Sequence, residues 1–162
     1  QINEYYNLKM FKKILLIIFV FSLLSNCEYK PIYSNLNKSE YQINILEFTG
    51  DKDLNRFIIK NLNKHNQSNS NKKFDVKINT KYLKNILAKN TAGSITDYQV
   101  EAITTFEINK NTITETLVIK EKFNYQKISD KYEEKGYEET IKKNLATSIS
   151  QKLILRLSVI KW

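Results

Sequence analysis

Hydrophobic and polar residues alternate through the middle of the chain, and this pattern predicts β-strands. The clearest case is residues 98–108, where Tyr98, Val100, Ala102, Phe106 and Ile108 share one face and polar residues fill most of the other. Such alternation is typical of a strand with one buried face. The sequence Asn-Lys-Asn at 109–111 then predicts a hairpin turn, and apolar positions between 113 and 125 predict the returning strand.

Two shorter alternating segments come earlier in the chain. Tyr41, Ile43 and Ile45 alternate with polar residues and predict a first strand. Residues 74–82 repeat the pattern and predict a second strand, after a polar loop at 65–73 and before a turn around 90–93.

Two segments with helical spacing predict amphipathic helices. In the first, Leu54, Phe57, Ile58 and Leu62 lie on one face, and Asp51 precedes them as a helix cap. The second begins near Gly136 and has an apolar residue at every fourth position: Ile141, Leu145, Ile149, Leu153 and Leu157. Residues 153–159 also alternate, but continuity with the upstream period favours a helix.

The predicted order is therefore strand, helix, three strands, helix. We expect an α+β fold, with a four-stranded, mostly antiparallel sheet, both helices packed on its apolar face and a polar second face. A chain of 162 residues fits one domain, which we assign to residues 41–162.

The first 26 residues resemble an export signal more than part of a fold. Met10 is followed by Lys12, Lys13 and an apolar run from Ile14 to Leu24, an order typical of a secretory signal. That run is about half the length of roughly 20 apolar residues that a membrane-spanning helix needs. We expect translation to start at Met10, with residues 1–9 as an upstream extension.

Cys27, the only cysteine, directly follows this segment. Leu24, Ser25, Asn26 and Cys27 resemble the lipobox of bacterial lipoproteins, in which the cysteine is acylated and the chain is cut before it. The alternative is a half-buried free cysteine. We expect lipidation at Cys27 and a membrane anchor, because two or more acyl chains anchor stably. Residues 27–40 are then the lipidated N-terminus and an extended tether, and Glu28 in place of aspartate favours the outer membrane.

The composition argues against an enzyme. There is one histidine, the three glycines stand far apart, and the neighbouring acids Glu133 with Glu134 and Glu138 with Glu139 fit solvated surface better than catalysis. No cofactor or metal is expected. The net charge of +9 attracts phosphates, but abundant lysine, asparagine and isoleucine also indicate an AT-rich genome. With arginine only at positions 56 and 156, nucleic acid is not an expected partner.

Three segments resemble the LptE-like family of lipopolysaccharide-assembly lipoproteins, in particular its alphaproteobacterial members. They are CEYKPIYS at residues 27–34, ITDYQVEAITTFEI at 95–108 and TIKKNLATSISQKLILRL at 140–157. The resemblance implies two helices on a four-stranded sheet. It also implies a function: an outer-membrane lipoprotein on the periplasmic face that plugs and helps assemble the β-barrel lipopolysaccharide translocon, an LptD-like protein, and binds lipopolysaccharide.

The resemblance also suggests site residues. Lipopolysaccharide would meet basic residues at the turn before the central strand and in the loop before the last helix, where the nearest matches are Lys89, Lys131 and Lys135. The barrel lumen would meet the polar sheet face, for which we expect Lys77, Lys81, Asp97, Gln99 and Glu101. An alternative function is a lipoprotein accessory subunit of an ABC-type lipid export system, which can share a small α+β shape.

Overall fold

The structure, a computed structural model, describes residues 41–66, 70 and 72–159. The expected signal segment, Cys27 and the tether lie outside these residues. The elements follow the predicted order: β1 (Tyr41–Gly50), α2 (Lys52–Asn63), β2 (Lys72–Lys89), β3 (Ile95–Lys110), β4 (Ile113–Gln126) and α3 (Lys131–Val159).

The four strands form one sheet in the order β1-β2-β3-β4. β1 pairs with β2 in parallel, and the other two pairs are antiparallel. The parallel pair follows from the connection, because α2 carries the chain back across the sheet before β2 begins. The predicted fold class is confirmed, including a sheet that is mostly but not purely antiparallel.

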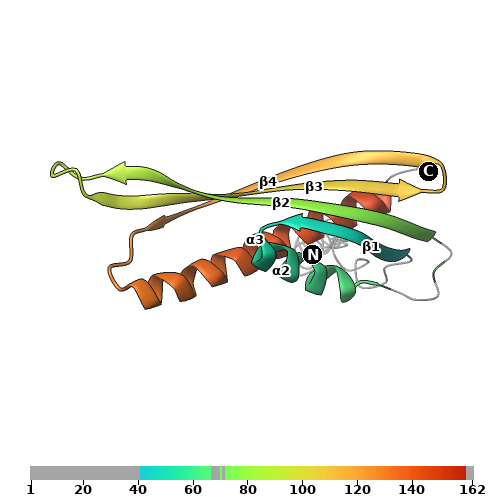
Figure 1. Cartoon of the computed structure of the whole chain (residues 1–162), viewed down its shortest axis with the longest axis horizontal. Coiled ribbons are helices and arrows are strands. Elements are labelled where there is room, and N and C mark those ends of the chain that lie inside the picture. Colours follow the sequence, from blue (N-terminus) through green and yellow to red (C-terminus); the bar gives the residue numbers. More distant parts are fainter. Residues whose placement is uncertain (1–40, 67–69, 71, 160–162) are drawn as a thin grey trace, which may run out of the picture. The chain divides into compact units, whose positions relative to one another are not determined.

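Both helices lie on the same face of the sheet (Figure 1). Apolar side chains of that face form the core with the apolar stripes of α2 and α3. The fully buried members include Phe74 and Val76 from β2, Phe106 from β3, Ile58 from α2 and Ile149 from α3. The alternation read from the sequence therefore marks the buried face correctly through the middle of the sheet.

Two predicted boundaries are wrong. β2 continues to Lys89, well past residue 82, because it stays paired with β3 out to Ile95 although its regular alternation ends. Helix α3 begins at Lys131 rather than near Gly136. Asp130 stabilises the earlier start, since its carboxylate accepts 2.8 Å hydrogen bonds from the backbone N–H groups of Tyr132 and Glu133.

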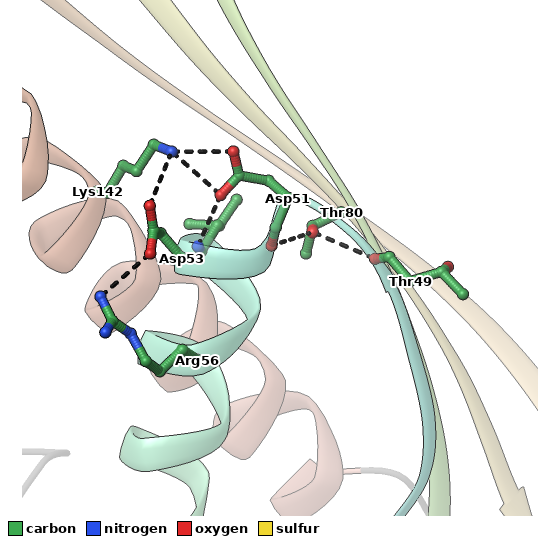
Figure 2. Close-up of polar contacts among 7 residues, drawn as sticks. Thr49, Asp51, Asp53, Arg56, Thr80 and Lys142 are labelled. Carbon is green, nitrogen blue, oxygen red and sulfur yellow. Dashed lines mark hydrogen bonds and ion pairs between the residues drawn. The ribbon is translucent and has the colours of Figure 1, made fainter.

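A polar cluster joins the start of α2 to α3 (Figure 2). The Asp51 side chain caps α2 by accepting the Leu54 N–H at 2.8 Å, as the sequence predicts, and its two oxygens lie 3.1 and 2.9 Å from Lys142 Nζ of α3. Burial alone would raise the pKa of Asp51, but these hydrogen bonds and the Lys142 charge lower it. Because Thr80 Oγ1 also donates to the backbone oxygen of Asp51 at 3.3 Å, the cluster ties both helices to β2.

Candidate functional surface

The outward face of the sheet, opposite the helices, is predominantly polar. We call it the outer face. Register places Lys77 beside Glu107, Lys81 beside Ile103 and Gln99 beside Asn124. The predicted barrel-facing residues Lys77, Lys81, Asp97, Gln99 and Glu101 all lie on it by strand parity. Their shared face is a consequence of the two-residue repeat of a strand.

Side chains on the outer face pair with one another across strands. Gln99 donates to Asn124 at 3.0 Å, and Lys122 Nζ lies 3.7 Å from the Glu101 carboxylate. Lys77 Nζ lies 4.0 Å from Glu47, beside a polar hollow of about 180 Å³. Its lining residues are Glu47, Thr49, Lys77, Ile78, Asn79, Thr105 and Glu107. The outer face can therefore offer hydrogen bonds and charges of both signs to a wet, polar partner surface.

The three lysines expected to contact lipopolysaccharide are all exposed. Lys89 is the last residue of β2, next to the turn at 90–94, whereas Lys131 and Lys135 lie on the first turns of α3 and not in a loop. Figure 1 shows α3 beginning toward the same end of the sheet as that turn. None of the three forms an ion pair with another described residue, so their charges remain available for an anion.

Near the start of α3, Lys84 of β2 contacts aromatic and acidic side chains. Its Nζ lies 4.1 Å from the Tyr98 ring centroid, forms a 3.0 Å ion pair with Glu134 and also bonds to Glu138. Tyr125 donates a 2.7 Å hydrogen bond to Glu138. This Lys84 cluster holds the first turns of α3 against the sheet.

The cluster corrects one sequence-based interpretation. Glu134 and Glu138 are not simply solvated surface, because their side chains are only 19% and 25% exposed and both turn to Lys84. Burial raises the pKa of Tyr125 to about 12. Burial would also raise the pKa of Glu138, but hydrogen bonds from Lys84 and Tyr125 lower it below its usual range. The arrangement is an ion-pair cluster in which Lys84, Glu138 and Tyr125 bond to one another.

Sequence reasoning missed an apolar groove between β4 and the last turns of α3. It measures about 390 Å³ and has Leu117, Val118, Leu155 and Val159 among its apolar lining, with Lys120, Lys152 and Arg156 at its rim. No periodic signal could have found it, because Val118 and Leu155 lie off the core faces of their own elements. The groove exists only because β4 and α3 are brought together.

Neither a cluster of metal-ligating side chains nor a membrane-spanning helix is found in the described part of the chain. Among residues 41–66, 70 and 72–159, no three His, Cys, Asp or Glu side chains gather in a way that could hold a metal ion. No helix within the same ranges combines the length and the apolar character needed to cross a membrane.

No protein-family model matches the sequence, and no curated protein sequence matches it. Solved structures do. Rare lipoprotein B from Shewanella oneidensis is 13% identical, with a TM-score of 0.54 over 72% of this chain and 93% of that one. A candidate lipoprotein from Caulobacter crescentus CB15 is 11% identical, with a TM-score of 0.53 over 76% of this chain and 93% of that one.

The chain shares the fold of these bacterial proteins. Because it spans nearly the whole of each neighbour, the likeness covers their complete domain and not a fragment. At these identities the comparison establishes the architecture, two helices on one face of a four-stranded sheet. It does not transfer a binding site residue by residue.

Proposed function

We propose that this protein is an outer-membrane lipoprotein that plugs and helps assemble the β-barrel through which lipopolysaccharide reaches the cell surface. The observation that carries the proposal is the outer face: a broad polar sheet surface on which Gln99 pairs with Asn124 and Lys122 with Glu101 across strands. A barrel lumen is wet and polar, so the charged side chains of such a surface can keep water or polar partners inside it.

Two further observations support the proposal. The fold is shared with rare lipoprotein B of Shewanella oneidensis, named as a lipoprotein. In this chain Cys27 follows an apolar run at the position where bacterial lipoproteins are acylated. Acyl chains at Cys27 would hold the domain on the periplasmic face of the outer membrane, with the tether linking it to β1.

The test is photo-crosslinking in cells from the outer face. A photoreactive amino acid at Gln99 should crosslink to an outer-membrane barrel protein, whereas the same residue at Thr147, exposed on α3, should give much less of that product. Mass spectrometry identifies the partner. An ATPase complex in the Gln99 product, with no barrel, would replace the proposal by the accessory subunit of an ABC-type lipid exporter.

A separate experiment tests the anchor. Cys27→Ala should abolish incorporation of labelled fatty acid and release processed protein into the soluble fraction. Labelling that persists in the variant would end the lipoprotein assignment while leaving the barrel contact to be judged by the crosslink.

A further inference from the structure

β2 projects beyond its neighbour β1 and leaves a free edge. Pairing between the two strands ends at Gly50 with Thr80, whereas β2 continues to Lys89. On the side away from β3, no described strand lies beside residues 81–89, a segment we call the free edge. Figure 1 shows β2 and β3 continuing past the end of β1. Free edges present unpaired backbone N–H and C=O groups to which another strand can add.

Apolar side chains gather on this edge. Leu83, Ile86 and Leu87 are 42%, 52% and 49% exposed. Leu83 and Ile86 point to opposite faces of the sheet by strand parity, and Leu87 lies in a register shift between Ile86 and Ala88. A strand added here would cover apolar surface on both of its faces as well as satisfy backbone groups.

The positive charge of the free edge indicates that the added strand carries acidic residues. Its sequence, KYLKNILAK, has three lysines and no acidic residue. Lys84 is neutralised by Glu134 and Glu138, while Lys81 and Lys89 form no ion pair with any other described residue. Opposite charges across neighbouring strands are stabilising, so the complementary strand carries acidic side chains together with apolar ones.

Two other occupants fit less well. A second copy of this chain, paired antiparallel along the same edge, would set Lys81 against Lys89, and like charges opposite one another are destabilising. A lipid surface would place unpaired backbone groups in hydrocarbon, which costs several kcal/mol for each group.

The edges of the two outermost strands, β1 and β4, differ from the free edge of β2. On β1, the Asn66 side chain donates to the Ile43 oxygen at 2.9 Å and accepts from its N–H at 3.0 Å, so it blocks strand addition there. The edge of β4 carries both signs of charge, and Glu115 and Glu121 already pair with Arg156 and Lys152 of α3.

We propose that the free edge of β2, residues 81–89, binds an extended acidic and apolar segment of a partner protein by strand addition. This interaction differs from the barrel-plug contact because it uses the backbone groups of the edge, although Lys81 also lies on the outer face. It gives the protein a second contact of the kind used when peptides extend an exposed sheet.

The test uses the purified full-length protein and a fluorescent nine-residue peptide in which glutamate alternates with valine. Anisotropy should show binding, and amide exchange should slow at least about tenfold within residues 81–89 but not within β4. The same peptide N-methylated at every residue keeps its charge and loses all of its backbone donors on both edges, so it should not bind. A lysine-for-glutamate peptide should also fail.

Matched protein variants complete the test. Lys81→Glu with Lys89→Glu should weaken peptide binding by about tenfold, since two attractions become repulsions. Lys120→Glu with Lys127→Glu makes the same charge change on or next to β4 and should leave binding unchanged.

Several results would overturn the proposal. These are no measurable binding, equal binding of the N-methylated peptide, and protection that falls on β4. Residues 81–89 already protected in a self-associated protein would point instead to a second copy. Protection by phosphatidylglycerol vesicles, without any by the peptide, would point to a lipid surface.

Discussion

Both halves of β2 are β-strand, but they lie in different environments. From residue 72 to 80 the strand lies between β1 and β3, and its inward side chains Phe74, Val76 and Ile78 are at most 2% exposed. From residue 81 to 89 it pairs with β3 alone among the described strands, and Leu83, Ile86 and Leu87 are about half exposed. The first half is stabilised by burial, and the second by its hydrogen bonds to β3 and by the Lys84 cluster.

The difference indicates that the first half of the strand stabilises the fold and that the second half can contact a partner. A residue packed in the core contributes mainly to the free energy of folding, whereas an exposed apolar residue on an unpaired edge contributes little to it. The exposed apolar side chains Leu83, Ile86 and Leu87 in the second half are therefore available for recognition. The same substitution made once in each half can test this difference.

The largest difference in unfolding free energy is expected when isoleucine is replaced by alanine once in each half of β2. Ile78→Ala removes a side chain that is 2% exposed and should lower the free energy of unfolding by roughly 2 to 5 kcal/mol through lost burial and a residual cavity. Ile86→Ala, at 52% exposed, should change it by less than about 0.5 kcal/mol. Urea unfolding followed by circular dichroism measures both. Equal losses would mean that the projecting half is also core.

The second prediction concerns lipopolysaccharide binding where β2 ends and α3 begins. Replacing Lys89, Lys131 and Lys135 by glutamate should weaken binding by roughly 2 to 3 kcal/mol, or about 30-fold to 150-fold, through lost attraction and new repulsion. The loss should shrink as salt rises, because screening weakens exposed charges. Binding of purified protein to lipopolysaccharide at low and moderate salt measures it.

A matched triple variant controls for net charge. Lys52, Lys60 and Lys73 are exposed and lie away from the start of α3, so their replacement by glutamate should have a smaller effect. Equal affinity of the first triple variant and the parent at low salt would show that the three predicted lysines are not part of a site.

Two glycines provide the third comparison. Gly50 ends β1 with φ of 96°, and a Cβ there would lie 1.8 Å from the Thr80 carbonyl oxygen. Gly93, in the turn after β2, has φ of 78°, and apart from its own residue and its two chain neighbours no heavy atom lies within 4 Å of such a Cβ. Gly50→Ala should therefore cost more than about 2 kcal/mol, and Gly93→Ala about 1 kcal/mol from backbone strain alone. Similar thermal midpoints for the two variants would contradict the close packing of β1 on β2.

The smallest effects are expected on the fall of unfolding free energy at low pH. The pKa values of Asp51 and Glu138 are lowered in the folded protein, so each carboxylate stabilises the fold above its unfolded pKa, near 4 to 4.5, and this contribution disappears as pH falls through the folded value. Both groups are partly exposed, so each should contribute less than about 1 kcal/mol.

Asp51→Asn and Glu138→Gln should each flatten the fall in unfolding free energy between about pH 5 and pH 3. Asp51→Ala should in addition lower stability by about 1 kcal/mol at neutral pH, because asparagine keeps the helix cap and alanine does not. Urea unfolding across this pH range measures all three. If the fall in unfolding free energy at low pH is unchanged in both Asp51→Asn and Glu138→Gln, the two carboxylates do not stabilise the fold.

Much of the fold could be predicted from the sequence, because local periodicity reports which side of an element is buried. Alternation in residues 98–108 marked Val100, Ala102, Phe106 and Ile108 as core, and all four are buried. The Asp51 cap was also predictable, because a helix cap needs only residues adjacent in sequence. The shared outward face of Lys77, Lys81, Gln99 and Glu101 follows from the same two-residue repeat.

Other features were decided only by the tertiary structure. The sequence does not determine that β2 runs to Lys89, since its last residues have no apolar repeat and are held by pairing with β3. Nor does it show that Glu134 and Glu138 pair with Lys84, which lies 50 and 54 residues away. Periodicity records the environment of a residue along its own element. A free edge, a groove or an ion-pair cluster depends on which distant elements meet, and that is set by packing of the whole domain.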